Sequence, residues 1–181
     1  MEPTRYTRTA IALHWAVALL VLVNLAFGLY VVDLPLSPQK LRFFSWHKWI
    51  GVTVFVLATA RILWRLGHVP PALPAAIPRW ERRFAEETHR LLYVLIFAAP
   101  LSGWLFSSAA GFQTVYLGVL PIPDLLARNR ELAEALKLGH HWINYTMAAV
   151  VALHIAAAFK HRLLDRDEVL ARMLPLPGRR P

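Results

Sequence analysis

Four of the eight histidines lie where they could bind a metal in pairs. His14 and His154 lie near the same end of two long apolar runs, the end on the side of the N-terminus. His47 and His140 lie at the opposite end of their own runs. An imidazole in apolar surroundings is costly unless it faces the protein interior and finds a partner. The matched depths therefore indicate two stacked sites, each with two histidine ligands.

The spacing of His140 and His154 supports this interpretation. They are fourteen residues apart, which is nearly four helical turns, so both side chains point the same way about 21 Å apart along the axis. One helix thus offers one ligand to each site. His14 completes the site on the N-terminal side, which we call the inner site, and His47 completes the outer site.

Two histidines per site favour haem over a bare metal ion. Zinc prefers three or four ligands from His, Cys or carboxylates, and the apolar runs contain no Asp or Glu. In haem the porphyrin supplies four ligands to iron, and two axial imidazoles complete the set. The absence of cysteine excludes thioether attachment, iron–sulfur clusters and disulfides. We therefore expect two haem b groups.

The remaining histidines are weaker candidates, because a lone histidine near a helix end is more often an interfacial residue. His141 points about 100° away from His140, yet as its neighbour it is the main rival ligand. His161 follows His154 by seven residues on the same stripe, and His89 begins the third apolar run on the inner side. Imidazole titrates near neutral pH. We therefore expect His161 first, and His89 second, to act catalytically by supplying protons to an electron acceptor on the inner side.

Two residues on the second apolar run share the face of His47. Gly51 lies one turn further along, where a missing side chain leaves room for a flat macrocycle. Arg61 lies fourteen residues after His47, and its guanidinium could pair with a haem propionate, since arginine binds carboxylates with two parallel hydrogen bonds. An arginine that extends its charge to the membrane surface explains the same placement equally well. On the third run, Gly103 could make room for the macrocycle as Gly51 does.

The elements that must position these residues are membrane-spanning helices. Hydrophobic residues make up 57% and charged residues 17% of the chain, which is too apolar for an ordinary soluble domain. Four runs approach the ~20 residues that a helix needs to cross the hydrocarbon core: 11–32, 47–64, 91–110 and 142–159. Residues 123–138, bounded by a proline and Gly139, predict a short amphipathic helix. We expect a single all-α domain over 1–181, an integral membrane four-helix bundle.

The net charge of +9 has a topological explanation rather than a nucleic-acid partner. Lys and Arg concentrate in the cytoplasmic loops of membrane proteins. Fourteen of the 20 lie on the side of the N-terminus: Arg5, Arg8, Arg61, Arg65, Arg79, Arg82, Arg83, Arg90, Lys160, Arg162, Arg166, Arg172, Arg179 and Arg180. The other side has Lys40, Arg42, Lys48, Arg128, Arg130 and Lys137. We therefore expect both termini in the cytoplasm.

Several short motifs follow one another along nearly the whole chain. They are Leu13-His14-Trp15, His47-x-x-x-Gly51, Arg61-x-x-x-Arg65, His89-x-x-x-Tyr93, Pro100-x-x-Gly103, His140, Leu153-His154 and Arg172-Met173-Leu174-Pro175. Their order resembles the bacterial cytochrome b561 family, the small four-helix di-haem cytochromes of the bacterial inner membrane. This resemblance implies that His14, His47, His140 and His154 are the axial haem ligands, the same four that depth selects.

The resemblance also implies an activity. Family members are similar to superoxide:ubiquinone oxidoreductases, so superoxide, ubiquinone and membrane lipid are the expected partners. The outer cations could steer the superoxide anion, although Asp33, Asp124, Glu131 and Glu134 oppose them and solvated loops commonly have such charges. Two alternatives stay open. One is a haem b subunit that passes electrons between a partner dehydrogenase or hydrogenase and quinone, and the other is a non-redox haem sensor or structural membrane protein.

Overall fold

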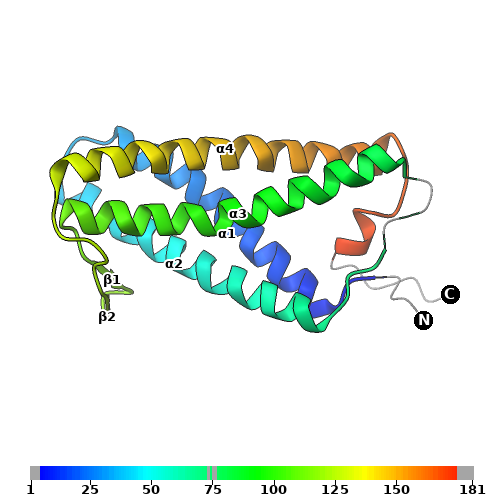
Figure 1. Cartoon of the computed structure of the whole chain (residues 1–181), viewed down its shortest axis with the longest axis horizontal. Helices are drawn as coiled ribbons and strands as arrows, with labels where there is room; N and C mark the ends of the chain where they lie inside the picture. The colour runs from blue at the N-terminus through cyan, green and yellow to red at the C-terminus, as the bar shows by residue number, and fades with distance from the viewer. Residues whose placement is uncertain (1–4, 73, 75–76, 175–181) are drawn as a thin grey trace.

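The computed structural model describes residues 5–72, 74 and 77–174, and this part of the chain contains four long helices. Their bounds are α1 (Arg8–Asp33), α2 (Pro38–Gly67), α3 (Arg79–Ala110) and α4 (Arg130–Leu163). Each is long and apolar enough to cross a membrane, and they lie roughly along the long axis of the molecule (Figure 1). The prediction of an all-α four-helix membrane bundle is confirmed.

Local sequence signals start and end these helices. The side chains of Thr7, Ser37 and Asn129 cap the N-termini of α1, α2 and α4 by accepting a hydrogen bond from the backbone N–H three residues later. Helix α3 follows Pro78 and ends at Gly111, whose φ of 79° is in the left-handed region. Glycine adopts that conformation without steric cost, which makes it the usual residue at a helix C-terminus.

The helices pack as two hairpins, α1 with α2 and α3 with α4, and α2 also contacts α3. A small apolar core lies between the hairpins and consists of Val17, Val21, Val54, Leu95, Ala99 and Met147. Met147 lies midway between His140 and His154 on α4 and is buried in this core. Large apolar side chains such as Leu19 and Leu63 are more than 60% exposed, as expected for surfaces that face lipid.

The predicted short helix over residues 123–138 is wrong. Residues 130–138 form the first turns of α4, which continues through Gly139, so His140 lies well inside a helix instead of at its start. The physical reason is that no helix forms directly after Pro121 and Pro123. The helix starts only where the Asn129 side chain caps its N-terminus. Helices also extend beyond the hydrocarbon core, whereas hydropathy marks only the part inside it.

A β-hairpin precedes α4 at the outer end of the bundle (Figure 1). Strands β1 (Thr114–Tyr116) and β2 (Leu120–Ile122) pair in antiparallel fashion, with Val115 opposite Pro121. The hairpin is attached to α2, because the Trp49 indole N–H donates to the Val115 carbonyl at 2.7 Å and the Thr53 and Tyr116 hydroxyls are 2.9 Å apart.

Helix α4 ends at the inner end of the bundle, and the chain continues there. There it forms the short 3-10 helix η1 (Ala171–Met173). The Trp15 indole N–H donates to the Met173 carbonyl at 2.7 Å, and the Arg5 guanidinium donates to the Ala171 carbonyl at 3.2 Å. The beginning and the end of the described chain therefore lie at the same end of the bundle (Figure 1). Pro175, Arg179 and Arg180 lie outside the described residues.

Candidate functional site

The inner site brings together histidines from three helices. His14 of α1 and His154 of α4 face each other, with ring centroids 6.4 Å apart and ring planes inclined by 76°. The ring of His89, on α3, lies 5.2 Å from that of His154 by the same measure. His14 Nδ1 is buried and has no hydrogen-bond partner among the described residues. The structure thus places the expected inner pair side by side and adds His89 to it.

The outer site joins His47 of α2 and His140 of α4. Their ring centroids are 6.3 Å apart and their planes are inclined by 84°. The ring that meets His47 is that of His140, as helical phase predicts, and not that of its neighbour His141. Because α4 contributes one histidine to each site, the two sites lie at two different depths along the same helix.

Both pairs fit an iron bound between two axial imidazoles. With metal–nitrogen bonds of about 2 Å, two rings that bind one metal from opposite sides have centroids about 6 Å apart. The observed separations of 6.3 and 6.4 Å match this distance. Within the described residues, neither pair has Asp, Glu or Cys ligands close enough to complete a zinc site. Two imidazoles alone suit a metal whose other ligands come from a macrocycle.

Two glycines lie against the outer histidines. A Cβ at Gly28 of α1 would be 2.9 Å from His47 Cε1, and a Cβ at Gly103 of α3 would be 3.1 Å from His140 Cε1. Gly51 has a different environment, because a Cβ there would meet Asn24 Nδ2 at 3.9 Å and the Pro100 side chain at 4.0 Å. It therefore faces the interior between α1 and α3 and does not contact an imidazole.

Arg61 lies at the inner end of the bundle, where its guanidinium carbon is 5.4 Å from the centroid of the Tyr93 ring. Arg61 and Arg65 line a cavity of about 30 Å³, together with Tyr6, Ala10, Trp64, His68, Tyr93 and Met173. The Tyr93 hydroxyl is buried and makes no hydrogen bond within the described part of the chain. Two guanidinium groups and an unpartnered phenol give this cavity the chemistry to receive a carboxylate.

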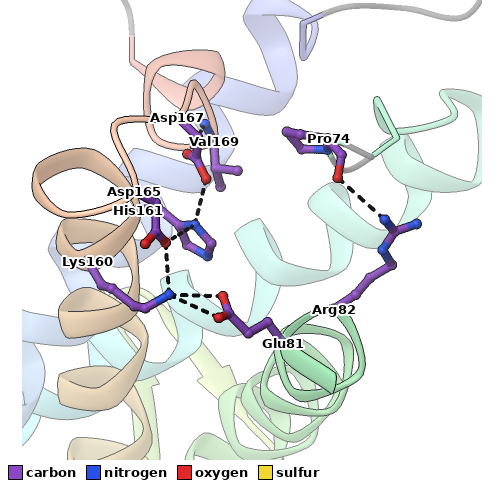
Figure 2. A network of polar contacts seen from close by, with 8 residues as sticks. All are labelled: Pro74, Glu81, Arg82, Lys160, His161, Asp165, Asp167 and Val169. Atoms are coloured by element: carbon purple, nitrogen blue, oxygen red, sulfur yellow. Dashed lines mark hydrogen bonds and ion pairs between the residues drawn. The ribbon is translucent and has the colours of Figure 1, made fainter. Parts of the chain in front are cut away.

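His161 lies in a network of charged residues where α4, α3 and the C-terminal segment meet (Figure 2). Its Nδ1 is 2.7 Å from Asp167 Oδ2 and 3.2 Å from Asp165 Oδ2. The Lys160 ammonium joins Asp165 at 2.8 Å to Glu81 at 3.0 Å. The His161 side chain is only 15% exposed. Three carboxylates and one ammonium thus surround an imidazole, a group that can hold and release a proton.

Gly28 and the carboxylates around His161 were not predicted from the sequence. A signal for Gly28 existed, because glycine inside a helix costs roughly 0.5–1 kcal/mol relative to alanine and so indicates a close approach. Asp165 and Asp167 follow His161 closely in sequence, but their contacts depend on the turn after α4, which hydropathy does not predict. Glu81 is 80 residues away from His161, and only the packing of α3 against α4 brings them together.

Comparison with known proteins gives consistent matches over the whole bundle. Residues 5–176 match the family model of prokaryotic cytochrome b561. The chain is 32% identical over 180 residues to cytochrome b561 homolog 2 of Escherichia coli K12, an alignment that covers 95% of this chain and 92% of the relative. For cytochrome b561 homolog 1 of the same organism, the values are 28% over 173 residues, 94% and 97%. A Yersinia pestis protein named probable superoxide oxidase CybB is 30% identical over 176 residues, with coverage of 94% and 96%.

Proposed function

The chain belongs to the prokaryotic cytochrome b561 family of electron-transfer membrane proteins, and we propose that it oxidises superoxide at the outer face of the inner membrane and reduces ubiquinone at the inner face. In balanced form, two superoxide anions lose one electron each and become dioxygen. One ubiquinone takes up these two electrons together with two protons. The inner face, on the side of both termini, is then the cytoplasmic face. Ubiquinone is reduced there, so its protons come from the cytoplasm.

The observation that carries the proposal is the presence of two imidazole pairs at two depths along one helix. His14 and His154 would hold an inner haem b, and His47 and His140 an outer one. His140 and His154 lie about 21 Å apart along α4, so the two sites occupy different depths of the bundle. When bound, each haem supplies a carrier of one electron at a time, which suits a one-electron donor.

Arg61 and Tyr93 would hold a carboxylate of the inner haem. The guanidinium of Arg61 lies over the Tyr93 ring, with its carbon 5.4 Å from the ring centroid, a distance at which a cation is attracted to the ring face. The Tyr93 hydroxyl has no hydrogen-bond partner among the described residues and could donate to the same group. Gly51 is packed between α1 and α3, where a Cβ would make ordinary van der Waals contact with Asn24 and Pro100 at 3.9 and 4.0 Å.

The outer face has the charge to attract superoxide. The Lys40 ammonium donates to the Val32 carbonyl at 2.9 Å, and the Lys48 ammonium donates to the Phe112 carbonyl at 3.1 Å. Neutral carbonyls do not cancel these charges, so both lysines still contribute to a positive field. Lys137 contributes less, because it pairs with Glu134 at 3.3 Å. A positive field at the mouth of a site raises the association rate of a small anion.

Proton supply to ubiquinone would come from His161. Its imidazole is held by Asp167 and Asp165 at the inner end of the bundle, and it lies seven residues beyond His154, about 10 Å along the helix axis. The carboxylates would keep the ring oriented and linked to the cytoplasmic surface. His89 is the second candidate, because its ring lies beside that of His154.

The name of the Yersinia pestis relative supports the superoxide part of the proposal.

The test is ubiquinol formation by the purified chain in detergent, with a steady source of superoxide and added ubiquinone. We expect ubiquinol to form, its formation to stop when excess superoxide dismutase is present, and the His47→Ala variant to form none. Ubiquinol formation that is absent, or that is insensitive to the dismutase, would contradict the proposal. If the chain still contained two haems, the subunit of a larger dehydrogenase or hydrogenase would then be the better assignment.

A further inference from the structure

Ser102 of α3 contacts the ring of His140, in the same turn as Gly103. Its hydroxyl oxygen lies 2.9 Å from His140 Nδ1 and 2.8 Å from the Ala99 carbonyl oxygen. Gly103 lies against Cε1 of the same ring. Two adjacent residues thus hold one imidazole, Gly103 by leaving room for it and Ser102 by a hydrogen bond.

The two contacts of Ser102 determine where the proton of His140 lies. A carbonyl oxygen only accepts hydrogen bonds, and a hydroxyl has one proton to donate. The Ser102 O–H therefore donates to Ala99, and its oxygen accepts a hydrogen bond from His140 Nδ1–H. A neutral imidazole has only one N–H, so His140 Nε2 has a lone pair that a metal could take. The Asn144 amide nitrogen lies 3.3 Å from both ring nitrogens, and its shortest hydrogen bond, at 2.7 Å, goes to the His140 carbonyl.

This support is missing at His14 of the inner site and at His47, the second histidine of the outer site. The Nδ1 atoms of His14 and His47 are buried and have no hydrogen-bond partner among the described residues. A hydrogen bond from the remote N–H of a metal-bound imidazole fixes its tautomer and makes the ligating nitrogen more basic. A more basic ligand favours the more positively charged ferric iron and therefore lowers the reduction potential of a haem.

We propose that Ser102 is a positioning residue that fixes the tautomer of His140 and lowers the reduction potential of the outer haem. This inference rests on the proposed function only in that haem must bind at the outer pair. It does not depend on superoxide or ubiquinone as substrates. A lower potential at the outer site suits electron flow from the outer face to the inner face.

The test is a potentiometric titration of the visible spectrum, with a pyridine haemochrome count of haem per chain, on wild-type protein and variants. We expect Ser102→Ala to keep two haems and to shift one of the two midpoint potentials upward. Ser102→Thr keeps the hydroxyl and should restore the wild-type value. Thr59→Ala is the matched control, because Thr59 makes the same hydroxyl-to-carbonyl bond to Phe55, at 2.8 Å. It should leave both potentials unchanged.

A second pair of variants keeps the test decisive if Ser102→Ala loses haem. Ser102→Thr and Ser102→Val have the same shape and differ only in hydroxyl against methyl. A higher outer potential in the valine variant supports the role of the hydroxyl, and equal potentials in the two overturn it. Two haems with unchanged potentials in Ser102→Ala would also overturn it, while the proposed function would stand. A wild-type chain that binds no haem would overturn both.

Discussion

Gly28 of α1 lies so close to His47 of α2 that a Cβ on this glycine would be 2.9 Å from His47 Cε1, a distance that real Cβ atoms essentially never show. Gly103 and His140 repeat the relationship between α3 and α4, at 3.1 Å. Each outer histidine thus lies against a glycine of the helix packed beside it. The outer site is built by all four helices, although only α2 and α4 contribute histidines.

We expect Gly28→Ala to displace the His47 ring and to weaken haem binding at the outer site. The haem content should fall from two towards one per chain, and Gly103→Ala should have a smaller effect because its contact is longer. Gly139→Ala is the control, since Gly139 is next to His140 but a Cβ there meets nothing within 4 Å. The pyridine haemochrome count checks this, and a Gly28→Ala chain with two unperturbed haems would contradict it.

His161→Ala should reduce the rate of ubiquinone reduction by about a hundredfold or more, in the range typical of lost general acid catalysis. Both haem spectra should stay intact, because His161 is seven residues away from His154. Asp167→Asn should give a weaker effect in the same direction, since it removes the carboxylate that lies 2.7 Å from the ring. His141→Ala, at the outer end, serves as the control. Ubiquinone turnover that is unchanged in His161→Ala would exclude this role.

Reversal of the outer charges should slow the reaction with superoxide. In the double variant Arg42→Glu and Arg130→Glu, we expect a several-fold lower second-order rate constant at low ionic strength, and a smaller difference at high salt, because electrostatic steering is screened. Arg83→Glu and Arg90→Glu make the same change in net charge at the inner end. If the inner variants slow the reaction as much as the outer ones, steering is not the cause.

Trp15→Phe should loosen the C-terminal segment over residues 165–174. The variant loses the indole hydrogen bond to the Met173 carbonyl, which is worth roughly 1 kcal/mol. Backbone hydrogen exchange in this segment should then be about fivefold faster, while α4 keeps its protection. Leu63→Ala, on the lipid-facing surface of α2, should leave exchange in the segment unchanged.

The bundle could be predicted from sequence because lipid imposes a simple rule on each span. Apolar runs such as 11–32 mark the hydrocarbon core, and they fall inside the observed helices. The same rule fails outside the core, where Asn129 and the prolines before it decide how the chain folds. For this reason the β-hairpin and the true start of α4 were not predicted.

The site shows the same division between periodic and tertiary information. The pairing of His14 with His154 and of His47 with His140 follows from depth and helical phase. The structure places the ring centroids of the two pairs 6.4 and 6.3 Å apart, a separation that suits one iron between the two rings. The contacts of Ser102 with His140 depend on the rotation of α3 against α4. No periodicity encodes that rotation, so Ser102 could be identified only from the packed structure.

The central claim is that each histidine pair holds one haem, and a haem count on histidine variants tests it most directly. The wild-type chain should bind two low-spin haem b groups per chain. His14→Ala and His47→Ala should each keep one haem, with different midpoint potentials, and the double variant should keep none. A wild-type chain with one haem or none, or a His47→Ala variant that keeps both, would contradict the assignment of the two pairs.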